Sequence, residues 1–141
     1  MAKKLPSRES NADWRDVLKS AESHLEAAEQ QLVLYEEKAT PNAKPIASAA
    51  VLAAIGFGDA LTVWRGGATN ANDHGRLPDL IASLLGAQAN AEQLTRLGRI
   101  LSKKNAAQYG GTFWTKDQAR DYLEQVRRFA GWARTVLPVR G

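Results

Sequence analysis

The sequence predicts an all-α domain, an up-and-down bundle of four long helices and one short helix. Three observations lead to this fold class. Apolar residues recur three and four positions apart through most of the chain, and Gly-Gly or Pro signals separate these stretches. No stretch alternates apolar and polar residues as a strand does, and no hairpin turn signal occurs. The 141 residues, 44% hydrophobic and 24% charged, suit a single domain with one core.

In the N-terminal part, the sequence predicts a short flexible segment, here called the lead-in, followed by a long helix. Residues 1–10 lack periodicity and are expected to be flexible, with one domain over residues 11–141. The helix is predicted from Asn11, a suitable N-cap, to about Lys38. Its apolar positions alternate spacings of four and three and form a heptad seam: Trp14, Leu18, Ala21, Leu25, Ala28, Leu32 and Tyr35. Such a seam packs within the bundle or against another chain.

A second helix is predicted to be the central one. It follows the break at residues 40–45 (TPNAKP) and runs to about Trp64, where the glycine pair at 66–67 ends it. The helix is rich in alanine and contains Gly56 and Gly58. Glycine inside a helix costs stability but lets a neighbouring backbone approach closely. We therefore expect other helices to pack tightly around this one.

Cap signals delimit the remaining helices. Residues 68–75 are expected to form a loop, followed by a short helix with Pro78 in its first turn and Gly86 at its end. Its inward residues are predicted to be Leu77, Ile81, Leu84 and Leu85. A fourth helix is expected from the cap at Asn90 to about Tyr109, before Gly110-Gly111.

The last helix is expected to start at a capping signal, Thr115-Lys-Asp-Gln118, and to end at Pro138. Its inward residues are predicted to be Tyr122, Val126, Phe129, Ala133 and Val136.

Two polar irregularities on apolar faces indicate a site. On the fourth helix, the face formed by Leu94, Leu97 and Leu101 continues into Lys104, Asn105 and Gln108. On the central helix, Asp59 lies among inward apolar positions. A buried carboxylate needs a basic partner or several hydrogen bonds, and Lys104 is the candidate partner. The pair is either a structural ion pair or part of a polar cluster that faces a ligand.

The charge is unevenly distributed along the chain. Residues 1–40 carry 6 basic and 8 acidic side chains, whereas residues 90–141 carry 10 and 4, so the +4 net charge comes from the last third. This excess is either a solvated face or a surface for phosphate groups. The candidate nucleic-acid-binding residues are Arg96, Arg99, Lys103, Arg120, Arg127, Arg128 and Arg134. Three of them, on the last helix, recur every seven residues.

The order of several short motifs resembles the HEPN superfamily, helical bundles associated with bacterial defence and toxin–antitoxin systems. The motifs are Asp59-Ala60-Leu61, a Gly-Gly loop ahead of His74, the stretch Leu101-Ser-Lys-Lys-Asn-Ala-Ala-Gln-Tyr109-Gly-Gly and an Ala/Arg-rich last helix. The resemblance covers roughly residues 12–137. It implies a homodimer whose site lies near the end of the fourth helix, with RNA, a nucleotide or a cognate protein as partner.

Catalytic members of that superfamily are metal-independent endoribonucleases with an arginine, a polar residue and a histidine, and these positions fall on Lys104, Asn105 and Tyr109 here. Lysine keeps the charge but lacks the guanidinium fork, and tyrosine is a poor general base at neutral pH. The resemblance therefore implies a non-catalytic or degenerate binding module. The alternatives are a divergent endoribonuclease, in which His74 or Tyr109 works with Lys104, and a structural assembly protein.

Other features bound these alternatives. The chain has no cysteine and no metal-ligand spacing, so we expect no metal or other cofactor. No signal peptide precedes the domain and no uncharged run is long enough to span a membrane, so we expect a cytoplasmic protein without a membrane partner. Trp132 is the best candidate for a dimer contact. A helix-turn-helix is a further alternative, because Ala82 and Gly86 have its spacing although Glu92 does not fit.

Overall fold

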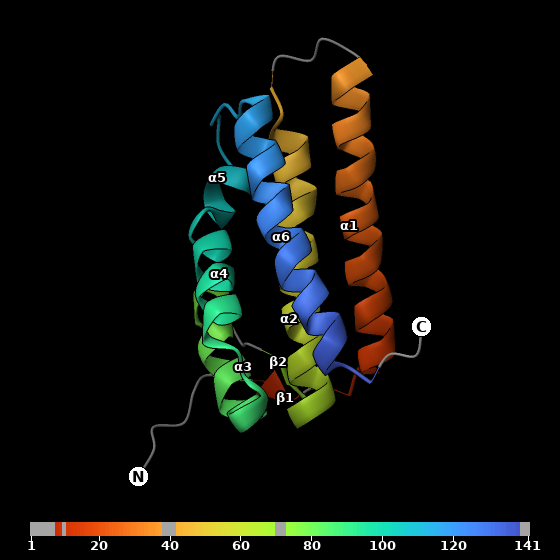
Figure 1. Cartoon of the computed structure of the whole chain (residues 1–141), viewed down its shortest axis with the longest axis vertical. Helices are drawn as coiled ribbons and strands as arrows, with labels where there is room; N and C mark the ends of the chain where they lie inside the picture. Colours follow the sequence, from red (N-terminus) through yellow and green to blue (C-terminus); the bar gives the residue numbers. More distant parts are fainter. Residues whose placement is uncertain (1–7, 10, 38–41, 70–72, 139–141) are drawn as a thin grey trace.

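Helix α2 forms the centre of an all-α bundle, as the sequence predicts (Figure 1). The computed structural model describes residues 8–9, 11–37, 42–69 and 73–138. The long helices are α1 (Trp14–Glu37), α2 (Lys44–Gly66) and α6 (Lys116–Val136), and the shorter ones are α3 (Leu77–Leu85), α4 (Ala91–Ser102) and α5 (Lys104–Gln108). Helix α1 lies on one side of α2 and α6, and α3, α4 and α5 lie on the other.

The heptad seam of α1 packs along α2 within the same chain. Ala21, Leu25 and Ala28 are buried, and the four outer seam residues are half-buried against the core. The close approach depends on Gly56, because a Cβ added there would lie 2.7 Å from the Cβ of Ala21. At Gly58 an added Cβ would lie 2.6 Å from the Leu77 side chain. The two glycines therefore let α2 contact α1 and α3 closely, as predicted.

Helix α2 is long and apolar enough to cross a membrane by length and composition, but 72% of its most apolar window is buried in the bundle. Burial of this extent fits the core helix of a soluble protein.

A short strand pair follows α2, where the sequence predicted only a loop. Strand β2 (Ala68–Thr69) pairs antiparallel with β1 (Arg8–Glu9). Strands of two residues are too short to show alternating hydrophobicity, so no periodic signal marks them. The rest of the 1–10 lead-in lies outside the described residues. The 3-10 helix η1 (His74–Arg76) leads directly into α3, which ends at Gly86 as predicted.

The fourth helix is broken, and the prediction of one continuous helix to Tyr109 was wrong. Helix α4 ends at Ser102, and α5 begins after Lys103. In an unbroken helix the Ile100 carbonyl would accept a hydrogen bond from the amide of residue 104. Instead it accepts from the Lys103 amide at 3.2 Å and from the Tyr122 hydroxyl at 2.7 Å. Tyr122 of α6 thus supplies one of the two hydrogen bonds that the Ile100 carbonyl accepts, at the point where α4 ends and the polar stretch forms the separate helix α5.

Two of the three predicted N-caps form; the one predicted at Asn11 does not, because α1 begins at Trp14 and Asp13 Oδ1 accepts from the Arg15 amide at 2.9 Å. The Gln93 amide donates to Asn90 Oδ1 at 3.0 Å at the start of α4. Thr115 and Gln118 form a reciprocal capping box at the start of α6, with distances of 3.1 and 3.0 Å. The inward face of α6 is buried as predicted, with Val136 half-buried at its end. These caps fix the ends of the two helices that flank α5.

Candidate functional site

His74 and Lys104 lie on the same polar cleft, although they are 30 residues apart in the chain. The cleft has a volume of about 250 Å³ and lies between the start of η1 and the junction of α4 with α5. Its lining residues are Asp73, His74, Gly75, Leu101, Ser102, Lys104 and Asn105. Three candidate residues from the sequence, His74, Lys104 and Asn105, are therefore brought together.

The backbone of η1 fixes the position of His74. Asp73 caps this 3-10 helix, with its Oδ1 accepting from the Gly75 amide at 2.9 Å and its carbonyl accepting from the Arg76 amide at 3.0 Å. The next residue, Leu77, is fully buried against Gly58 of α2. His74 is consequently anchored one short turn away from the core.

Helix α5 is held by contacts on three sides. The Trp114 indole donates to the Ala106 carbonyl at 3.0 Å, and Ala107 is fully buried. The Lys44 ammonium group donates to the Tyr109 carbonyl at 3.0 Å and also to the Gly110 carbonyl. Five residues do not form a stable helix alone, so these contacts are what keep Lys104 and Asn105 at the cleft.

The two central side chains influence each other electrostatically. The pKa of His74 is lowered from 6.5, first by burial and then by the charge of Lys104, while Asp73 opposes the change. His74 is therefore a neutral imidazole at neutral pH. Among the described residues, the side chains of Lys104 and Asn105 form no hydrogen bond or ion pair. The ammonium group of Lys104 lies 5.7 Å from the ring centroid of Tyr109, although Tyr109 does not line the cleft itself.

This arrangement suits an anionic ligand. It offers an ammonium group, an amide and an imidazole within one small volume. Phosphate oxygens are bound by such donors, and a neutral imidazole can accept a proton or, once protonated, donate to the anion. The Ser102 hydroxyl, which also lines the cleft, donates to the Arg99 carbonyl at 2.6 Å, and the Asp73 carboxylate accepts from the Gly75 amide at 2.9 Å. Within the part of the chain that the structure describes, no group of three His, Asp or Glu side chains is placed to hold a metal ion.

Asp59 does not belong to this cleft. The expected Asp59–Lys104 ion pair is not formed, because no ion pair of the described residues involves either side chain. Asp59 is half-buried on α2, and burial raises its pKa from 3.8 to about 6. The two polar irregularities in the sequence are therefore separate features.

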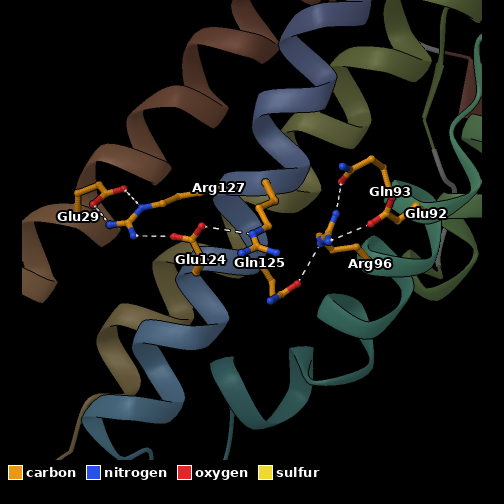
Figure 2. Close-up of polar contacts among 8 residues, drawn as sticks. Glu29, Glu92, Gln93, Arg96, Glu124, Gln125 and Arg127 are labelled. Carbon is orange, nitrogen blue, oxygen red and sulfur yellow. Dashed lines mark hydrogen bonds and ion pairs between the residues drawn. The ribbon is translucent and has the colours of Figure 1, made fainter.

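The arginine stripe of α6 is directed at α1 and does not form an unpaired basic face. Arg127 binds Glu29 and Glu124, with 2.6 Å from its Nε to Glu29 Oε1 (Figure 2). Arg134 binds Glu22 through two bonds of 2.8 and 2.6 Å, and Arg120 binds Glu36. The three acidic partners also recur every seven residues, on an antiparallel helix. We call these three pairs the α1–α6 ladder.

Two more basic candidates are paired within the chain. Arg96 donates to Gln125 and Gln93, and lies 3.7 Å from Glu92 (Figure 2). Arg128 contacts Glu124 at 3.4 Å. By contrast, Arg99 and Lys103 form no side-chain hydrogen bond or ion pair with the described residues. Within the described part of the chain, these two alone of the predicted nucleic-acid-binding set remain unneutralised.

Some site residues were not foreseen. Ser102 and Asp73 line the cleft, and Lys44 holds the end of α5. The positions of Asp73 and Ser102 next to His74 and Lys104 could have indicated the first two, but Lys44 is distant in sequence. Trp132, the proposed dimer contact, is half-buried with its ring 5.8 Å from that of Phe129.

Among known protein structures, a similar fold is found. The crystal structure of TT1696 from Thermus thermophilus superposes with a TM-score of 0.67 at 20% sequence identity, covering 88% of this chain and 98% of that one. The two chains share a fold. No protein-family model and no curated protein sequence matches this chain.

Proposed function

We propose that this chain is a HEPN-like binding module that holds a phosphate group of RNA, or of a nucleotide, in the His74–Lys104 cleft. The observation that carries the proposal is the convergence of His74, Lys104, Asn105 and Ser102 on one polar cleft of about 250 Å³. Two of these residues fall on the positions of the family's catalytic motif. The absence of arginine and histidine from that motif favours binding without cleavage.

The proposal includes a biological setting. We propose a cytoplasmic protein of a toxin–antitoxin or defence system that assembles as a homodimer and acts with a cognate protein partner. Assembly through the heptad seam of α1 is not favoured, because the buried part of that seam packs on α2 within one chain. A dimer would therefore use another surface.

A divergent, metal-independent endoribonuclease is the second candidate, favoured by one specific observation. Burial and Lys104 lower the pKa of His74, which keeps its imidazole neutral and able to accept a proton at neutral pH. His74 could thus act as general base in place of the histidine that Tyr109 replaces. Cleavage by this route would lose rate only when the pH falls below the lowered pKa of His74.

Binding and cleavage of RNA by the purified protein test both candidates. We would compare wild type with Lys104→Ala and His74→Ala in EDTA at two salt concentrations. The matched control is Lys19→Ala, which removes the same charge from an exposed position on α1. Loss of one charge-assisted hydrogen bond costs about 1.5–3 kcal/mol, so Lys104→Ala should weaken binding by roughly 10- to 150-fold.

The outcomes separate the two candidates. Binding that depends on Lys104 without cleavage supports the binding module. Cleavage that persists in EDTA and is lost in both cleft variants establishes the nuclease. If wild type binds no RNA and no nucleotide, or if Lys19→Ala behaves as Lys104→Ala does, the cleft has been wrongly assigned.

A further inference from the structure

Two aromatic side chains are exposed near Lys103 and Lys104, at the junction of α4 with α5. Tyr109 is 61% exposed and Phe113 is 55% exposed, and both lie in or at the start of the connection from α5 to α6. They are four residues apart, so their backbones are separated by at most about 14 Å. Exposed rings beside cations offer a face for stacking and a charge for a phosphate, the combination used by surfaces that bind single-stranded nucleic acid.

A lysine without an ion pair among the described residues lies near each ring. The ammonium group of Lys104 lies 5.7 Å from the Tyr109 ring centroid and also lines the His74 cleft. Lys103 and Phe113 line a second cleft of about 230 Å³. Neither lysine forms an ion pair with a described residue, whereas the arginines of the α1–α6 ladder are neutralised by glutamates.

Positive charge continues from Lys103 along α4. Arg99 is one turn earlier, and the two side chains line a groove of about 250 Å³ together with Gln125 and Asp121. Among the described residues that line this groove, Asp121 is the one carboxylate. Lys104 thus lines the His74 cleft, Lys103 lines both the cleft at Phe113 and the groove on α4, and Arg99 lines that groove.

We propose that this surface binds single-stranded RNA, with phosphates at Lys103 and Lys104 and bases stacked on Tyr109 and Phe113. The inference rests on the proposed function and specifies its ligand. Stacking requires an unpaired base with an accessible face, which a duplex does not offer. Cations that contact the backbone, combined with aromatic rings on which bases stack, are how proteins bind a single strand without reading its sequence.

The test is fluorescence anisotropy with the full-length protein and labelled 12-nucleotide polyuridine or a 12-base-pair RNA duplex. Stacking contributes about 1–3 kcal/mol per base, so Tyr109→Ala and Phe113→Ala should each weaken single-strand binding by roughly 5- to 150-fold. Tyr109→Phe should bind as wild type does, because it keeps the ring. Val33→Ala is the matched control, an equally exposed apolar side chain on α1. Lys103→Ala should reduce the salt slope by about 0.7, the value for one phosphate of a single strand.

Different results would refute this inference and the proposed function. If Lys104→Ala and His74→Ala weaken RNA binding but both aromatic variants bind as wild type does, stacking is refuted and the cleft stands. Binding of the duplex as tight as that of the single strand also refutes the inference. Absence of binding to every RNA and nucleotide refutes both proposals. Since Tyr109 and Phe113 are exposed, circular dichroism should show that their variants remain folded.

Discussion

Replacing Asp59 with asparagine is expected to stabilise the protein at neutral pH. Burial raises the pKa of Asp59 from 3.8 to about 6, and its carboxylate has no ion pair among the described residues. One pKa unit corresponds to 1.36 kcal/mol, so the charged form destabilises the fold by about 3 kcal/mol at pH 7. Asparagine has nearly the same shape and removes the charge. We therefore expect Asp59→Asn to raise the free energy of unfolding by up to about 3 kcal/mol.

The pH dependence gives a sharper form of this prediction. In the folded protein Asp59 binds a proton below about pH 6, whereas in the unfolded chain it does so only near pH 4. The penalty is thus fully present above pH 6 and disappears as the pH falls to about 4. The advantage of Asp59→Asn over wild type should therefore shrink by about 3 kcal/mol between pH 7 and pH 4.

Urea denaturation of both proteins at several pH values measures this difference. Taking the difference between the two proteins cancels every contribution to the pH dependence that both proteins share. Asp121→Asn, at an exposed position on α6, is the matched control and should show no such trend. A constant difference from pH 7 to pH 4, or equal stability at pH 7, would refute the assignment of a desolvated charge to Asp59.

Three further predictions concern the packing of the bundle. Gly56→Ala should lower the free energy of unfolding by about 1–3 kcal/mol, because the added Cβ would lie 2.7 Å from the Cβ of Ala21 on α1. Gly98→Ala should raise it by about 0.4–1 kcal/mol, because no atom lies within 4 Å of the added Cβ. Thermal denaturation of the two variants measures both changes. Tyr122→Phe should cost about 1 kcal/mol by removing the hydroxyl bond to the α4 carbonyl, and faster amide hydrogen exchange in α5 should accompany it. Arg127→Ala should lower the free energy of unfolding by about 1 kcal/mol, with a smaller loss at 1 M salt, and a loss that does not depend on salt would contradict an electrostatic role.

Features encoded within a few residues could be predicted from the sequence. The heptad seam of α1, the caps at Asn90 and Thr115 and the closing Gly86 are local patterns, and each appears in the structure. The break after α4 was not predicted, because the Tyr122 hydroxyl that donates to the Ile100 carbonyl at the break is 22 residues away in the chain. Periodicity describes one helix at a time and carries no information on which side chain of another helix reaches it.

The candidate site shows the same limit. The sequence singled out Lys104, Asn105 and His74 separately, but their convergence depends on how η1 packs beside α4. The basic stripe of α6 was visible as a seven-residue period. Its neutralisation was not, because only the fold shows that a helix with glutamates at the same period lies opposite.

The α1–α6 ladder also has a consequence for the order of folding. Its partners are 84, 98 and 112 residues apart, so each pair closes a loop that contains more than half of the chain. Contacts of such high sequence separation form after local ones, because the entropy of loop closure must first be overcome. Interactions that are absent from the transition state affect the unfolding rate and leave the folding rate almost unchanged. We therefore expect the three pairs of the α1–α6 ladder to form late in folding and to slow unfolding, which lengthens the lifetime of the folded state.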